Sequence, residues 1–175
     1  GEVKKEKFWQ LDFSVSKLPF KEAVFALDNL TNQAVKSRLM SDVPIGIFLS
    51  GGLDSSTIAY YAQKNSGQKI KTFSIGFEEK SFDESRYAKT VSDFLGTEHC
   101  HSFFTSKEML EIVPGLVNLL DEPMADASII PTYVLSKFTR QYVTVVLGGD
   151  GGDELFAGYP TFQAEAMVSL YSKLP

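Results

Sequence analysis

The pattern of hydrophobic and polar residues divides most of the chain into helices and strands. Apolar side chains at steps of three and four residues predict amphipathic helices, whereas short apolar or alternating runs rich in β-branched residues predict strands. Helices are expected over residues 20–40, 54–65, 81–95, 105–120, 129–140 and 161–173. Strands are expected over residues 45–49, 70–77, 97–103 and 143–147.

Several helix boundaries carry residues that favour them. Thr105 and Glu108 have the spacing of a capping box, and so do Ser81 and Glu84. Proline lacks the backbone N–H and its ring clashes with the preceding turn. We therefore expect Pro114 to interrupt the helix that starts after Thr105.

The first predicted helix carries an apolar stripe along one side. Its members recur at helical spacing: Phe20, Val24, Leu27, Leu30 and Ala34. In a globular domain such a stripe usually faces the core. We therefore expect it to be packed inside the domain rather than to form a partner site.

The order of the elements predicts the fold class. Strands that alternate with helices are typical of βαβ units. We therefore predict an α/β fold, with a doubly wound parallel sheet and helices on both of its faces. Ligands of such sheets bind beyond the carboxyl ends of the strands. Three loops are expected there, at residues 50–55, 76–79 and 148–154.

The chain divides into a short arm and one domain. Residues 1–19 begin with a charged run and are expected to form an arm or linker, and residues 20–175 are expected to form the domain. The first residue is glycine and the last follows a helical pattern directly. We therefore expect an excised piece of a longer chain, with the domain truncated at its C-terminus.

Composition and charge exclude several classes of protein. With 175 residues, 43% hydrophobic and 22% charged, the chain is an ordinary soluble domain. The net charge of −5 argues against a nucleic-acid-binding surface. No apolar run approaches the roughly 20 residues needed to span a bilayer, so no membrane contact is expected. The single cysteine, Cys100, fits a reducing compartment, and we expect a cytoplasmic location.

The most informative stretch is IGIFLSGGLDSS, at residues 45–56. A buried strand followed by glycines and a helix N-terminus makes an anion site, because the first N–H groups of a helix are unpaired. No lysine follows Gly51 and Gly52, so this is not the loop with the GxxxxGK[ST] pattern. Asp54 inside the loop suits Mg²⁺ placed between a carboxylate and phosphates. The alternative for the two glycines alone is a plain tight turn.

A second glycine-rich stretch, LGGDGGDELFAGY at residues 147–159, follows the last predicted strand. Its acids Asp150, Asp153 and Glu154 would repel a phosphate loop unless a cation or a proton offsets the charge. Mg²⁺ that bridges Asp54 and Asp153 to the phosphates of a ligand would do so. The alternative is a polar turn that caps the next helix, but this leaves the glycines around Asp150 unexplained.

Together these stretches resemble one known family. Residues 50–56 are similar to the PP-loop of N-type ATP pyrophosphatases. With residues 121–133 and 147–159 added, the chain resembles the synthetase domain of glutamine-dependent asparagine synthetase over about residues 8–175. The DELFAGY segment is the narrower signal, and it is shared with β-lactam synthetase relatives.

The resemblance implies an asparagine synthase (glutamine-hydrolysing)-like ligase that uses ATP and Mg²⁺. The β-carboxylate of aspartate would attack the α-phosphate, giving β-aspartyl-AMP and pyrophosphate, and ammonia would then displace AMP to give asparagine. Ammonia would come from a glutaminase domain that this sequence lacks. A homodimeric parent protein is a further expectation.

The resemblance also implies roles for individual residues. The nucleotide and its pyrophosphate would be held by Leu49, Ser50, Gly51, Gly52, Asp54, Ser55, Ser56, Ser74, Ile75, Gly76, Gly148 and Gly149. Asp54 and Asp153 would be the metal ligands. The catalytic group would be Asp150, which orients the intermediate and handles a proton, with Glu154 and Tyr159 beside it.

Two features leave the acceptor open. Many family members carry Ser-Gly-Glu where this chain has Gly148-Gly149-Asp150. The side chain of Asp150 is therefore one methylene shorter than glutamate, and the serine hydroxyl is absent. The alternatives are an adenylating enzyme with another acceptor, similar to β-lactam synthetase, and a piece that binds nucleotide without turnover. His99 and His101 share one face of a predicted strand, but two ligands without a third favour ordinary strand histidines over a metal site.

Overall fold

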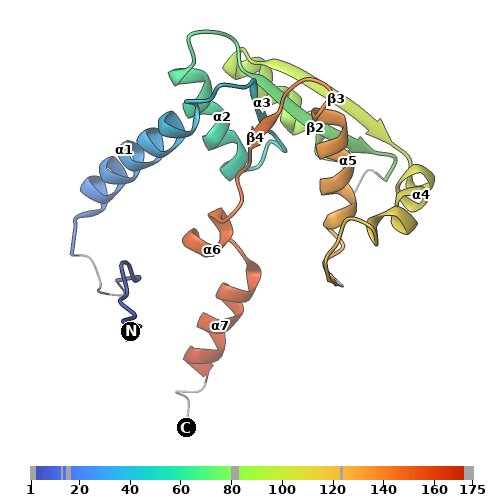
Figure 1. Cartoon of the computed structure of the whole chain (residues 1–175). Coiled ribbons are helices and arrows are strands. Elements are labelled where there is room, and N and C mark those ends of the chain that lie inside the picture. Colours follow the sequence, from blue (N-terminus) through green and yellow to red (C-terminus); the bar gives the residue numbers. More distant parts are fainter. Residues whose placement is uncertain (1–2, 13, 15–16, 80–82, 123, 172–175) are drawn as a thin grey trace.

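The computed structural model describes residues 3–12, 14, 17–79, 83–122 and 124–171. It has the predicted α/β fold, with a four-stranded parallel sheet and flanking helices (Figure 1). The strands are β1 Ile45–Phe48, β2 Lys71–Phe77, β3 Glu98–Phe104 and β4 Val145–Leu147. The four expected strands are therefore confirmed, with small shifts at their ends.

The order of the strands creates a switch point. The sheet order is β3-β2-β1-β4, so the chain runs outward from β1 to β3 and later returns to add β4 on the other side of β1. The register pairs Ile47 of β1 with Thr72 of β2 and Leu147 of β4. The loops after β1 and β4 therefore leave the same edge of the sheet side by side, where ligands of such sheets bind.

The described part of the chain contains seven helices. They are α1 Phe20–Arg38, α2 Leu53–Asn65, α3 Ser85–Leu95, α4 Ser106–Leu116, α5 Ile129–Thr139, α6 Gly152–Phe156 and α7 Pro160–Tyr171. Figure 1 shows α6 and α7 extending away from the sheet, below β4. None of the helices in the described ranges combines the length and the apolar character needed to cross a membrane.

The helices pack on both faces of the sheet, as predicted for a doubly wound fold. On one face, Ile47 of β1 packs with Ala59 of α2 and Ala88 of α3 in the main buried cluster. On the other face, Phe73 of β2 stacks edge-on against Phe138 of α5, with their ring centroids 6.2 Å apart. Buried apolar surface on each face holds the layers together.

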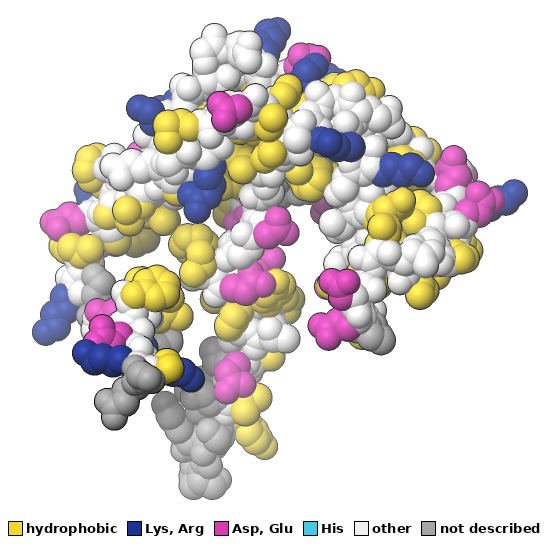
Figure 2. All heavy atoms as spheres, viewed as in Figure 1, with side chains coloured by type: hydrophobic (Ala, Val, Ile, Leu, Met, Phe, Trp, Pro, Cys, Tyr) yellow, Lys and Arg dark blue, Asp and Glu magenta, His cyan; other side chains and the backbone are white. Residues whose placement is uncertain are grey.

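The predicted stripe of α1 does not face the core. Phe20 is 83% exposed and Leu30 is 64% exposed, whereas Val35 is buried against α2. The helix also meets α2 through polar pairs, including a hydrogen bond from Asn65 to Asn32. Helical periodicity locates an apolar face but does not say which element covers it. In Figure 2 hydrophobic side chains are visible along α1.

The helix boundaries differ in detail from those predicted. The capping box of Thr105 and Glu108 is confirmed, with the Glu108 N–H donating to Thr105 Oγ1 at 3.2 Å. Pro114 does not interrupt the helix, which continues through it and ends two residues later at Leu116. Ser81 lies outside the described residues, and α3 begins after Glu84, so that acid is not in the predicted capping position.

Candidate functional site

A cleft of about 780 Å³ opens beyond the carboxyl ends of β1, β2 and β4. Its walls come from the loops at residues 48–55 and 148–154, from the end of β2, and from the first turns of α5. In Figure 2 it lies in the middle of the view, beneath the sheet and beside the acidic side chains that gather over α6. Its volume is typical of a site for a small molecule.

The loop after β1 is held in shape by contacts that require glycine. Gly51 has a φ of +89°, which favours glycine because other residues are strained there. A Cβ at Gly51 would lie 2.5 Å from Tyr87 Cβ and 2.6 Å from Ala88 N on α3. The helix α3 thus packs directly on the loop and fixes the start of α2.

Hydroxyl groups close the same loop on itself. The Oγ atoms of Ser50 and Ser55 lie 2.9 Å apart, and the Gly52 N–H donates to Ser50 Oγ. The first helical hydrogen bond of α2 runs from the Ser56 N–H to the Gly52 carbonyl. The N–H groups before it lie at the positive end of the helix, where anions bind.

The two glycine-rich loops contact each other closely, Gly149 against the backbone of α2 and Gly152 against the side chain of Asp54. A Cβ at Gly149 would lie 2.7 Å from Ser55 N, and a Cβ at Gly152 would lie 2.4 Å from Asp54 Cγ. At Gly149, where the neighbours include backbone atoms, only a residue without a side chain allows this approach. The contact places Asp54 against Gly152, the first residue of α6. Asp153 is the next residue of that helix.

The acids of the second loop differ in their surroundings. The carboxylate of Asp150 lies over Gly148, and that of Asp153 lies against Gly158. Glu154 accepts a hydrogen bond of 2.7 Å from the Tyr159 hydroxyl. This bond raises the pKa of Tyr159 to about 12 and lowers the pKa of the Glu154 carboxyl. Tyr159 is therefore a neutral donor near pH 7.

All the charged side chains among the described residues that line the cleft are acidic. Five of the described lining residues are acidic, and they are Asp54, Glu84, Asp150, Asp153 and Glu154. The described lining contains no lysine, arginine or histidine. An anionic ligand would therefore need cations to enter. Within the described ranges no group of three or more His, Cys, Asp and Glu side chains is arranged to hold a metal by itself.

Most of the predicted site residues line the cleft. They include Leu49, Ser50, Gly52, Asp54, Ser55, Ser74, Ile75, Gly148, Gly149, Asp150, Asp153, Glu154 and Tyr159. Gly51, Ser56 and Gly76 do not. Gly51 packs on α3, Gly76 lies against His101 of β3, and the Ser56 hydroxyl is buried without a hydrogen-bond partner among the described residues.

Some lining residues were not predicted to belong to the site. Pro131, Thr132 and Leu135 reach the cleft from the first turns of α5. Phe73 and Phe77 contribute from β2. The sequence indicates residues 131–133 only as part of a motif, without a role in the site. The contact arises because α5 covers the sheet face that carries these phenylalanines.

Comparison with known proteins identifies the relatives of the chain. The sequence model of the asparagine synthase family matches residues 26–175. A Methanocaldococcus jannaschii relative with the provisional name asparagine synthetase [glutamine-hydrolyzing] 2 is 42% identical over 99% of this chain. Asparagine synthetase [glutamine-hydrolyzing] 1 of Bacillus subtilis is 33% identical over the whole chain. The chain spans 34% and 28% of the lengths of these two relatives.

A solved structure shows a similar fold. NMN synthetase from Francisella tularensis superposes with a TM-score of 0.51 at 19% identity, covering 82% of this chain and 59% of that chain. At this identity the likeness concerns the fold alone. It agrees with the parallel sheet and flanking helices described above.

Proposed function

This chain belongs to the asparagine synthase family, and we propose that it forms the ATP-binding part of an ATP-dependent amide ligase. The observation that carries the proposal is the meeting of two loops at one cleft. The serine-glycine loop at the start of α2 and the acidic loop before α6 touch through Gly149 and Gly152. One loop offers N–H and hydroxyl groups to phosphates, and the other offers carboxylates.

The electrostatics of the cleft favour a nucleotide that arrives with metal ions. A triphosphate is repelled by carboxylates unless cations lie between them. Mg²⁺ takes oxygen ligands, and it is usually held by one or two carboxylates together with substrate phosphates. Asp54 and Asp153 fit that pattern, because both line the cleft and neither forms an ion pair with another described residue. The ion would supply neutralisation of the charge on the phosphates.

The side chains of the cleft would have separate roles in the two steps of the reaction. The β-carboxylate oxygen of aspartate would attack the α-phosphorus of ATP, and pyrophosphate would leave along the first turn of α2. Ammonia would then attack the acyl carbon, AMP would leave, and Asp150 would take the proton from nitrogen. Tyr159 donates its single O–H to Glu154, so its oxygen would accept a hydrogen bond from the substrate. In the parent protein a glutaminase domain would supply the ammonia.

The test is ATP–pyrophosphate exchange in the full-length protein. We expect exchange that requires aspartate, and an Asp150→Asn variant that keeps exchange but loses most amide formation. Asp42→Asn is the matched control, because Asp42 is an exposed acid outside the cleft. Exchange that is independent of aspartate, or that another carboxylate supports better, would show that the acceptor is wrong. The β-lactam synthetase-like alternative predicts the latter result.

A further inference from the structure

A chain of side-chain hydrogen bonds runs through the interior from α3 to the cleft. Ser92 Oγ lies 2.8 Å from Thr97 Oγ1, which lies 3.0 Å from Thr72 Oγ1 of β2. Thr72 Oγ1 is 2.9 Å from Nδ1 of His99, and Nε2 of the same ring is 3.1 Å from Ser74 Oγ. Ser74 is one of the residues that line the cleft. We call these five residues the hydroxyl relay.

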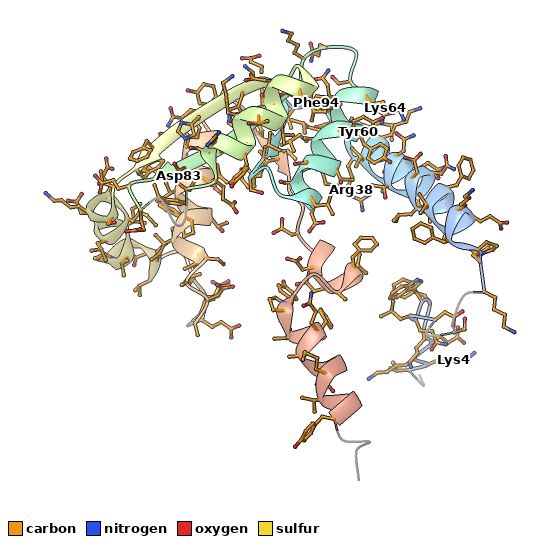
Figure 3. The ribbon with its side chains drawn as sticks, turned by 180° about the vertical axis from the view of Figure 1, so that it is seen from behind. Lys4, Arg38, Tyr60, Lys64, Asp83 and Phe94 are labelled. Carbon is orange, nitrogen blue, oxygen red and sulfur yellow. The ribbon has the colours of Figure 1, made fainter. Side chains whose placement is uncertain are left out.

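Three of the five relay residues are buried, and Thr97 and His99 are half-buried. Thr72 is 0% exposed, Ser92 is 1% exposed and Ser74 is 5% exposed. In Figure 3 the labelled Phe94 of α3 points outward, and it is 86% exposed, so the opposite side of α3 with Ser92 faces the sheet. Hydroxyls buried this way must satisfy each other, because an unpaired buried polar group is costly.

The tautomer of His99 decides the direction of donation at both ends of its ring. Each hydroxyl donates one hydrogen, and a neutral imidazole has one donor and one acceptor nitrogen. In the first direction Ser92 donates toward Thr72, Thr72 donates to Nδ1 of His99, and the Nε2–H donates to Ser74. In the second direction every donor and acceptor is exchanged. Burial of His99 lowers its pKa and favours the neutral ring that both directions need.

We propose that His99 is a positioning residue for the nucleotide cleft. Through the hydroxyl relay, His99 sets whether Ser74 offers a ligand its hydrogen or a lone pair. In the first direction Ser74 accepts from His99 and keeps its own O–H for the ligand. In the second direction Ser74 donates its hydrogen to His99, so it can only accept a hydrogen bond from the ligand. The inference rests on the proposed function, since the ligand meant is the base or ribose of a nucleotide.

A double-mutant cycle on nucleotide affinity tests this inference in the full-length protein. Asn in place of His99 keeps the bond to Thr72 but is too short to reach Ser74. We expect His99→Asn and Ser74→Ala each to weaken MgATP binding about 2- to 10-fold, as the loss of one oriented hydrogen bond does. The double variant should be no weaker than either single variant, because both remove the same interaction.

Matched variants separate positioning from mere folding. His101→Asn changes a histidine of the same strand that lies outside the relay, and its MgATP affinity should equal that of the wild type. His99→Gln places an amide near the position of Nε2, so it should restore part of the affinity. In ¹⁵N NMR spectra, the ring of His99 should shift toward a single tautomer when nucleotide binds.

The outcomes are distinct. Unchanged affinity in His99→Asn, or losses that multiply in the double variant, would overturn the inference while leaving the proposed function standing. A folded wild-type protein that does not bind MgATP would overturn both. Loss of stability without loss of affinity would show that the relay is only a structural cluster, and it too would overturn the inference.

Discussion

Replacing Gly51 by alanine should destabilise the domain strongly, because two separate penalties meet at this residue. Its φ of +89° costs a residue with a side chain about 1–2 kcal/mol. Its new Cβ would also lie 2.5–2.6 Å from backbone atoms and the Cβ of α3, which cannot move as a flexible side chain does. Overpacking of this kind costs about 1–3 kcal/mol. We therefore expect a loss of about 2–5 kcal/mol.

Two other glycines separate the penalties. Gly96 has a φ of +70° but open space around it, so Gly96→Ala should cost about 1–2 kcal/mol from the backbone alone. Gly67 has neither a positive φ nor a neighbour within 4 Å. Gly67→Ala should therefore leave stability unchanged or raise it by up to about 1 kcal/mol.

The assay is urea unfolding of each variant, followed by circular dichroism. The free energies of unfolding should fall in the order Gly67→Ala, Gly96→Ala and Gly51→Ala. A Gly51→Ala variant as stable as Gly96→Ala would refute the reasoning, since it would show that α3 does not press on the loop. Such a result would also remove the argument that α3 fixes the start of α2.

Two further predictions concern ligand and pH. Gly152→Ala should leave stability almost intact but weaken MgATP binding in calorimetry, because its Cβ would displace the flexible carboxylate of Asp54; unchanged affinity would contradict the placement of Asp54. His99 has a pKa lowered by burial, so the unfolded chain binds a proton more readily, and the stability that neutral His99 contributes should be lost as pH falls below the ordinary value of 6.5. Urea unfolding at pH 7.5 and 5.5 should therefore show a larger loss for wild type than for His99→Gln, and equal losses would contradict this.

The fold was predictable wherever local pattern and tertiary packing agree. The strand β1 appears in the sequence as a short apolar run, and it is buried on both faces of the sheet. The helix α6 was not predicted, because its five residues show no helical period. It is bounded by positive φ angles at Gly151 and Ala157, and its first residue packs on Asp54. These are tertiary constraints that a local pattern does not contain.

The site was predictable at its motifs and not between them. Glycines that serve packing and glycines that face a ligand look alike in a sequence. Gly51 and Gly76 are predicted to hold the nucleotide, and in the structure they contact α3 and β3 and do not line the cleft. The relay joins Thr72, Ser92 and His99 from three elements. No spacing in the sequence indicates such a cluster, because the register of β2 on β3 brings it together.

The central claim is that the loop of α2 and the acidic loop together bind MgATP. Calorimetric titration of the full-length protein with MgATP tests it most directly, beside Asp54→Asn and the control Asp42→Asn. We predict binding that weakens at least about tenfold in Asp54→Asn and equally when EDTA removes Mg²⁺, with no change in the control. Equal affinity in folded wild type and Asp54→Asn, or binding that is indifferent to Mg²⁺, would contradict the account.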